Sequence, residues 1–229
     1  MTSIAIIPAR GGSKRIPRKN VRSLAGKPAI AYPIDLALKS GLFERVIVST
    51  DDQEIASIAL KFGAEIPFIR STKLGDDFTT TVEVISDAVQ KLELRSTQYV
   101  CCIYPVTPLL IEKRLEQAHE LLKAGNWDYV FPACEYSTPI ERSFRKNPSG
   151  KVDFLNSNYE TTRTQDLEKT FYDAGQFYFG ITEAWLNKVP ILSGNSTFIE
   201  LEKNETVDVD ELADWDLVEF LLKARRQKN

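Results

Sequence analysis

The alternation of short apolar runs with amphipathic segments is the feature that most constrains how this chain can fold. Residues 4–7 are apolar throughout and are followed by Pro8, a pattern typical of a strand buried on both faces. A helix is predicted next, over residues 28–40, and Gly41 ends it. The alternation continues to residue 133. It predicts an α/β fold with a Rossmann-like mixed, mostly parallel sheet that helices cover on both faces.

The remaining elements follow from the same periodicities. Strands are predicted at residues 45–50, 66–69, 99–104, 129–133, 176–180 and 197–201, and helices at 52–62, 79–92, 112–124, 183–187 and 215–226. Residues 135–175 interrupt the pattern with polar, proline- and glycine-containing sequence, and a hairpin turn is predicted at 147–150. We therefore expect a single domain over 1–229, with a small β-rich insertion or dimerisation arm at about 135–175.

The charge balance excludes some classes of partner. The 229 residues include 29 Lys plus Arg and 32 Asp plus Glu, so the net charge is −3 and the chain lacks the overall positive field of a general nucleic-acid binder. No stretch approaches the ~20 apolar residues of a membrane span. The N-terminus also lacks a basic start followed by an apolar core. We expect a cytoplasmic protein with no nucleic-acid or membrane partner.

The few cysteines and the single histidine exclude other chemistry. Cys101, Cys102 and Cys134 lie in apolar, strand-like stretches and are expected to be buried, reduced thiols. His119 is predicted to lie at the surface of the helix over 112–124. With one histidine in the chain, an imidazole-rich metal site or a hydrolase triad is not expected. The chemistry is expected to use carboxylates, cations, backbone amides and hydroxyls.

The segment 8–20, Pro-Ala-Arg-Gly-Gly-Ser-Lys-Arg-Ile-Pro-Arg-Lys-Asn, has the composition of a polyphosphate cradle. Glycines let backbone N–H groups approach phosphate oxygens, and arginine and lysine offset the negative charge. Ligands of an open α/β sheet bind at the carboxyl ends of its strands, which is where this segment begins. The alternative is a solvated basic loop, but the order of strand, glycine pair and cations favours phosphate binding.

Two common nucleotide motifs are missing from this segment. It contains no Gly-x-x-x-x-Gly-Lys-Ser/Thr sequence and no Gly-x-Gly-x-x-Gly sequence. ATPase and dehydrogenase interpretations therefore lose their main support.

Residues 8–20, with Gly-Lys-Pro at 26–28, resemble the signature of the sugar-acid cytidylyltransferases, which activate acidic sugars with CTP. Residues 48–52, 70–77 and 208–210 resemble further motifs of the same family, so the resemblance spans nearly the whole chain. It implies a nucleotide-diphospho-sugar transferase type of fold. It also implies transfer of CMP from CTP to the anomeric hydroxyl of an acidic nonulosonic sugar with release of pyrophosphate, the use of Mg²⁺, and a homodimer formed through the arm.

The segment after the fourth strand bears on the sugar. Members that activate sialic acid usually carry Gln-Pro-Thr-Ser-Pro-Leu-Arg there, whereas residues 104–110 read Tyr-Pro-Val-Thr-Pro-Leu-Leu. Together with residues 163–167 and 172–178, this segment resembles the branch specific for pseudaminic acid. N-acetylneuraminic acid and the octulosonic acid of lipopolysaccharide are the alternatives within the class. A non-catalytic nucleotide-binding module, or another α/β enzyme with a basic loop, is the alternative outside it.

The resemblance also implies roles for individual residues. Nucleotide contacts are expected from Ala9, Arg10, Gly11, Gly12, Ser13, Lys14, Asn20 and Arg70, with Asp76 and Asp77 either beside them or capping the helix at 79–92. The catalytic residues are expected to be Arg10, Lys14, Lys19 and Asp210. Sugar contacts are expected from Tyr104, Arg163, Gln165, Asp173 and Gln176. Arg163 is the preferred clamp for the sugar carboxylate, because a guanidinium binds a carboxylate bidentately, and a solvent-facing arm residue is the alternative.

Asp208 and Asp210 are the expected magnesium ligands. Alternation at a strand end would point both carboxylates to one face. Magnesium binds through one or two carboxylates plus substrate phosphates, which suits a pair of aspartates beside a triphosphate. The alternatives are an acidic N-cap for the helix over 215–226, and a carboxylate that orients the attacking hydroxyl.

Overall fold

The computed structural model describes residues 2–76 and 78–228, with side chains through Arg225, around a seven-stranded sheet of order β11-β6-β10-β5-β1-β4 in which β9 also pairs with β6. The strands of this sheet are β1 (Ser3–Pro8), β4 (Phe43–Ser49), β5 (Tyr99–Ile103), β6 (Tyr129–Glu135), β9 (Phe171–Asp173), β10 (Phe177–Ile181) and β11 (Ser196–Glu200). The helices are α1 (Ala31–Lys39), α2 (Gln53–Lys61), α3 (Thr81–Lys91), α4 (Glu112–Ala124), α5 (Thr182–Leu186) and α6 (Leu212–Lys228).

Five of the seven strands run in one direction, and only β9 and β10 oppose their neighbours. The α/β fold with a mixed, mostly parallel sheet is therefore confirmed. Two small hairpins lie outside this sheet, β2 (Ser23–Leu24) with β3 (Lys27–Pro28) and β7 (Phe144–Lys146) with β8 (Val152–Phe154).

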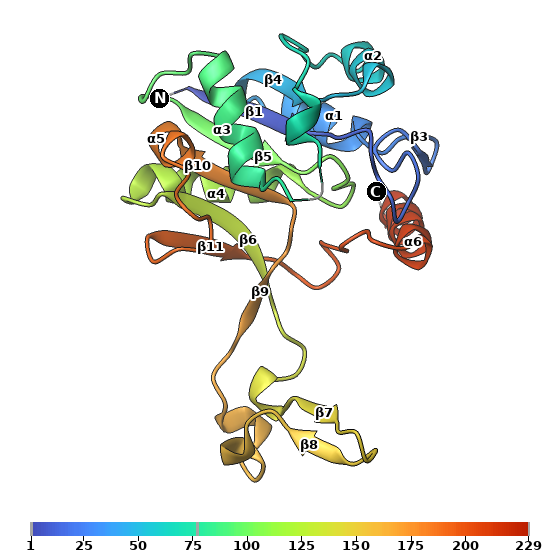
Figure 1. The fold of residues 1–229 in the computed structure, drawn as a ribbon, viewed down its shortest axis with the longest axis vertical. Coiled ribbons are helices and arrows are strands. Elements are labelled where there is room, and N and C mark those ends of the chain that lie inside the picture. Colours follow the sequence, from blue (N-terminus) through green and yellow to red (C-terminus); the bar gives the residue numbers. More distant parts are fainter. Residues whose placement is uncertain (1, 77, 229) are drawn as a thin grey trace.

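Helices cover both faces of the sheet because its central strands are apolar on both sides (Figure 1). Ala5 and Ile7 of β1 point to the face that α1, α2 and α4 cover, and Ile4 and Ile6 point to the face that α3 and α5 cover. All four side chains are at most 1% exposed. The sheet edge that carries the strand ends is thereby held rigidly, which is what a site built on it needs.

A third, smaller core lies under α6. Trp215 and Val218 of this helix pack with Ile16, Leu109 and Val209. These come from the first loop (residues 8–20), the segment after β5 (104–110) and the acidic segment (206–211). Three segments far apart in the sequence are thus held together next to the carboxyl ends of β1 and β5.

The strand predicted at residues 66–69 is wrong. Only Glu65 forms a bridge, to Ile47 of β4, and residues 66–69 run on without a ladder. Pro67 explains the difference, since proline has no N–H to donate to a neighbouring strand. Arg70 still reaches the expected sheet edge, because its backbone N–H donates to the Thr50 carbonyl at 2.8 Å, just beyond β4.

The surface position predicted for His119 is also wrong. The ring is buried between α4 and the sheet, where it stacks on Phe179 at 5.4 Å and meets the Tyr99 ring edge-on at 5.9 Å. Its Nε2 lies 3.1 Å from the Ser3 hydroxyl. Residue 119 falls on the apolar face of an amphipathic helix, and that periodicity outweighs the polarity of imidazole.

The cysteines are buried and unbonded to one another, as expected. Burial raises the pKa of each thiol, so all three stay protonated. Within the described part of the chain, no helix is both long and apolar enough to cross a membrane.

The arm leaves the sheet as a two-stranded neck (Figure 1). β6 continues beyond its neighbours, and β9 returns along it with Ala133 opposite Asp173. At the far end, β7 and β8 form the predicted hairpin, whose turn Asn147 organises by accepting hydrogen bonds from the Ser149 and Lys151 amides. The arm therefore projects from the α/β body through residues 135–171.

The buried histidine predicts a specific loss of stability in acid. Burial, and next to it the charge of Lys123, holds the pKa of His119 below its ordinary value of 6.5. Below about pH 6.5 the unfolded chain therefore binds a proton that the folded chain resists, and the free energy of unfolding falls as the pH falls. We expect His119→Phe to unfold with a shallower pH dependence between pH 7 and pH 5. Equal slopes in urea titrations of the two proteins would contradict this assignment.

Candidate active site

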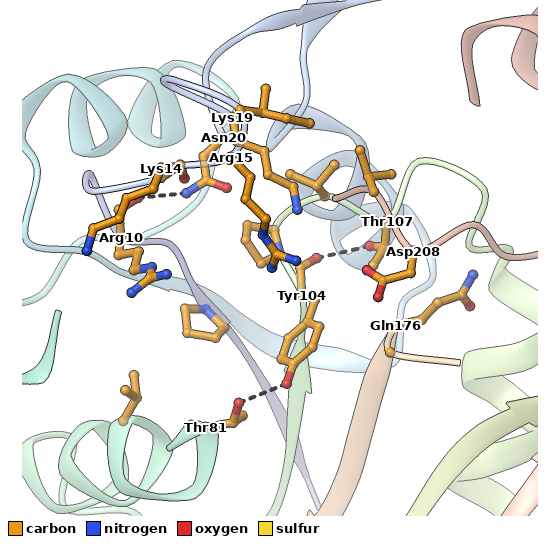
Figure 2. Close-up of a pocket in the computed structure, with 18 of the residues that line it drawn as sticks. Arg10, Lys14, Arg15, Lys19, Asn20, Thr81, Tyr104, Thr107, Gln176 and Asp208 are labelled. Atoms are coloured by element: carbon orange, nitrogen blue, oxygen red, sulfur yellow. Dashed lines mark hydrogen bonds between the residues drawn. The ribbon is translucent and has the colours of Figure 1, made fainter. Parts of the chain in front are cut away.

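A cavity of about 410 Å³ opens where β1 and β5 end. Its walls are the first loop, the start of α3, the segment after β5 and the acidic segment (Figure 2). Of the residues predicted to contact the nucleotide, the sugar or the metal, nine line it: Arg10, Ser13, Lys14, Lys19, Asn20, Arg70, Tyr104, Gln176 and Asp208. Asp76, predicted either beside the nucleotide contacts or as a helix cap, lines it as well. The predicted nucleotide end and part of the predicted sugar end thus share one hollow.

The first loop is braced from inside and from the end of β4. The buried Asn20 donates its amide to the Arg10 carbonyl at 2.9 Å, which ties the two ends of the loop together. The Gly11 N–H donates to Asp51 at 3.0 Å. Arg18 pairs with Asp52 at 2.5 Å, and this pairing lowers the pKa of the Asp52 carboxyl. One of the loop's five cations is thus neutralised at its back, and the loop has a defined shape before any ligand binds.

The two glycines of this loop have different environments. A Cβ on Gly11 would lie 2.7 Å from an Asp52 carboxylate oxygen, whereas a Cβ on Gly12 would meet nothing within 4 Å. Gly11 is therefore required by the packing of the protein itself, and Gly12 is not. The buried Ala9, before them, continues the line of β1.

Cations line one side of the cavity. Arg10, Lys14, Arg15 and Lys19 approach from the loop, with Asp208 opposite (Figure 2). Arg10 also donates to the Asp76 carbonyl at 2.8 Å. Burial lowers the pKa of Lys19, although Asp210 stands 3.8 Å from its ammonium. A cluster of this kind attracts a polyanion such as a triphosphate.

Arg15 is a site residue that the sequence reasoning missed. It lines the cavity and forms an ion pair with Asp210, linking the first loop to the acidic segment. Its position in the cation-rich segment 8–20 could have indicated a site role from the sequence.

The acidic segment, residues 206–211, has no regular secondary structure and belongs to no sheet. The expected alternation is not seen at the cavity, because Asp208 lines it together with Val207 and Val209, and Val209 also packs under α6. Asp210 does not line it, and its carboxylate meets Arg15 and Lys19. Partial desolvation and then the charge of Asp210 raise the pKa of Asp208, against the opposing charges of Lys19 and Arg15.

The alternative role of these aspartates as a helix cap does not hold. Asp214 caps α6, because its carboxylate accepts the N–H groups of Asp210 and Glu211 at 2.9 and 2.7 Å. Asp208 instead lines the cavity, and Asp210 pairs with the loop cations Arg15 and Lys19.

Arg70 lies beneath the nucleotide side of the cavity. Its side chain is 2% exposed and stands 3.7 Å from the Asp51 carboxylate. Burial lowers the pKa of its guanidinium, and its Nε has no hydrogen-bond partner among the described residues. A buried donor of this kind needs a partner, which a water molecule or a bound ligand can supply.

Helix α3 is capped at its N-terminus by Thr80. Thr80 and Glu83 form a capping box, so Asp76 is not the cap. The Asp76 carboxylate instead accepts the N–H groups of Phe78 and Thr79 in the preceding turn. Asp77 lies outside the described residues.

The predicted sugar residues separate into two groups. Tyr104 and Gln176 line the cavity, and the Tyr104 hydroxyl lies 2.8 Å from that of Thr81 (Figure 2). Asp173 ends β9 beside them. Arg163 and Gln165 lie on the arm instead, where Arg163 is exposed and pairs with Asp166 at 2.7 Å. Gln165 lines a separate hollow at the root of the arm.

An open α/β sheet, a braced glycine loop rich in cations and an aspartate across the cavity from it together define a nucleotidyltransferase-like site. The comparison with known families agrees, because residues 4–210 match the cytidylyltransferase family. The chain therefore belongs to the cytidylyltransferases, nucleotidyltransferases that use CTP.

Individual relatives narrow the comparison. The protein of Campylobacter jejuni named pseudaminic acid cytidylyltransferase is 40% identical over 229 residues, covering 99% of each chain. The CMP-N,N'-diacetyllegionaminic acid synthase of Legionella pneumophila is 30% identical over 236 residues, again covering 99% of each. The solved structure of CMP:2-keto-3-deoxy-manno-octonic acid synthetase complexed with CTP superposes with a TM-score of 0.75 at 18% identity, covering 98% of this chain and 100% of that one. That likeness shows the shared fold.

The two glycines predict a matched pair of variants. Gly11→Ala should lower the free energy of unfolding by about 1–3 kcal/mol, because the new methyl group overlaps Asp52. Gly12→Ala should leave the stability of the ligand-free protein unchanged. If backbone amides here approach phosphate closely, Gly12→Ala should still weaken CTP binding, measured by titration calorimetry. Unchanged CTP affinity in Gly12→Ala would remove Gly12 from the cradle.

Proposed function

We propose that this protein transfers CMP from CTP to the anomeric hydroxyl of pseudaminic acid and releases pyrophosphate. The observation that carries the proposal is the 40% identity, over 99% of both chains, to the Campylobacter jejuni enzyme of that name. The cavity supports the proposal, because residues of the first loop and Tyr104, from the distinctive 104–110 segment, line the same space. CTP as the substrate also supports a cytoplasmic location.

The nucleotide end works by positioning and charge. Arg10 and Lys14 hold the triphosphate on the loop amides, with Ala9, Gly12 and Ser13 beside them. Because the fixed cations meet the charge that develops on the phosphoryl oxygens, no covalent intermediate is needed. Lys19, kept partly desolvated, stabilises the leaving pyrophosphate or the sugar carboxylate.

Asp208 and Asp210 fit a magnesium ion. They offer hard oxygen ligands of the kind that Mg²⁺ prefers, and Asp208 lines the cavity with Asp210 two residues further along the chain. Among the described residues no cluster of three or more His, Cys, Asp or Glu side chains could hold a metal, so phosphates and water would complete the shell. When bound, Mg²⁺ would neutralise phosphate charge. Asp210 would then exchange its contacts with Arg15 and Lys19 for this role.

The sugar end is formed by Tyr104, Gln176 and the neighbouring β9–β10 connection. The Gln176 amide is held by the Glu205 carbonyl at 2.6 Å, which also fixes the approach to the acidic segment. Where sialic-acid enzymes usually carry glutamine, the Tyr104 ring makes the pocket wall bulkier and less polar. This difference favours a sugar with a less polar substituent at that wall.

The arm supports a homodimer. Four large apolar side chains on it are between 45% and 64% exposed: Ile140, Phe144, Val152 and Leu155. Together they form an apolar surface that a partner subunit would cover. Since Arg163 and Gln165 lie on this arm and not in the cavity of their own subunit, we propose that they complete the sugar pocket of the partner.

The reaction is tested by pyrophosphate release with CTP and Mg²⁺. Pseudaminic acid should support turnover, whereas N-acetylneuraminic acid, octulosonic acid and UTP in place of CTP should not. Turnover with another sugar acid alone would keep the reaction and overturn the sugar. Silence with every sugar acid, with CTP still bound, would favour a non-catalytic nucleotide-binding module.

Sharing of the site between subunits is tested by co-expressing two weak variants, Arg163→Ala and Asp210→Asn. If the arm serves the partner, each mixed dimer contains one intact site, and about a quarter of wild-type turnover returns in a statistical mixture. If the arm serves its own subunit, every site in the mixed dimer stays defective. No recovery in a verified mixed dimer would contradict the arrangement.

A further inference from the structure

The Asp173 carboxylate is used inside the protein. Its Oδ1 accepts the Gly175 N–H at 2.8 Å, and its Oδ2 accepts the Tyr178 hydroxyl at 2.5 Å. Asp173 is the last residue of β9, and Gly175 lines the cavity. A carboxylate with both oxygens engaged by protein donors is poorly placed to be a direct sugar ligand, so its role has to be exerted through its partners.

Tyr178 carries that role to the cavity. Its side chain is buried, at 4% exposure, and its ring meets Tyr104 edge-on, with the centroids 5.5 Å apart and the planes at 73°. The hydroxyl bond to Asp173 fixes the Tyr178 ring along its length, and an edge-on aromatic contact is sensitive to that orientation. Phe131 packs against the same ring, with centroids 6.2 Å apart.

Tyr104 is held at each remaining point. Its hydroxyl lies 2.8 Å from that of Thr81, the first residue of α3 (Figure 2). Its N–H donates to the Gln176 carbonyl at 2.8 Å, and its own carbonyl accepts the Thr107 hydroxyl at 3.0 Å. The ring is therefore a fixed wall of the cavity, and Tyr178 is the support behind it.

We propose that Asp173 and Tyr178 are positioning residues, which hold the Tyr104 ring as a wall of the sugar pocket and so set the affinity for the sugar acid. The inference rests on the proposed function in that Tyr104 faces the sugar. It changes the role expected for Asp173, from sugar ligand to support. It also connects the pocket to the arm, because Asp173 pairs with Ala133 in the neck.

The test is Tyr178→Phe, which keeps the ring and removes the hydroxyl. The matched control is Tyr129→Phe. Tyr129 is also a buried tyrosine of the same sheet whose hydroxyl donates to a single acceptor, the Val189 carbonyl at 3.1 Å, but it does not line the cavity. Because Tyr178→Phe removes a hydrogen bond to a charged group, it should raise KM for the sugar acid about 10-fold and leave KM for CTP unchanged. Tyr129→Phe should change neither constant.

A double variant shows whether Tyr178 acts through Tyr104. In a Tyr104→Leu background, Tyr178→Phe should have no further effect on KM for the sugar acid, because the supported ring is gone. The proposal is overturned if the effect persists in that background, if KM for CTP rises equally, or if Tyr129→Phe has the same effect.

A ligand-free measurement separates this proposal from the proposed function. In protein labelled with 3-fluorotyrosine, the ¹⁹F resonance that Tyr104→Phe removes should shift or broaden in Tyr178→Phe and stay in place in Tyr129→Phe. An unmoved Tyr104 resonance in Tyr178→Phe would overturn the support role. If no sugar acid gives turnover, the proposed function fails, while this spectrum still decides the role of Tyr178.

Discussion

The small core under α6 is the constraint on which the rest of the site depends. Trp215 packs there against Ile16, Leu109 and Val209, which come from the first loop, the segment after β5 and the acidic segment. Five cations within thirteen residues repel one another, and two aspartates in one short segment do the same. Apolar burial at one point in each segment holds these like charges together and faces the two sets toward each other.

The fold was largely predictable because its signal is periodic. Apolar runs at β1 and β5, and glycines that end helices such as Gly41 and Gly63, mark the elements within a few residues. The failures have local causes. Pro67 removes a ladder donor from an otherwise strand-like run, and His119 lies on the buried face of α4 despite its polarity.

The site was predictable where its residues share one loop and unpredictable where it depends on pairing in space. The order of glycines and cations in residues 8–20 pointed to one binding loop, and residues of this loop do line one cavity. Composition could not show that Arg15 meets Asp210, that Asp214 takes the capping role, or that the Asp173 carboxylate turns inward to Tyr178. The Arg15–Asp210 pair joins segments far apart in the sequence, and the Asp173–Tyr178 bond depends on how β9 and β10 are placed. The capping role of Asp214 depends on which of several neighbouring acidic residues reaches the helix N-terminus.

Function in this protein depends on the first loop binding the triphosphate of CTP while the acidic segment faces it across the cavity. A crystal structure of the protein with CTP and Mg²⁺ tests this most directly. We expect phosphate oxygens within hydrogen-bond distance of the amides of residues 10–14, the cytidine over Arg70, and the metal on Asp208 or Asp210. A triphosphate bound elsewhere, with the loop unchanged and empty, would contradict it.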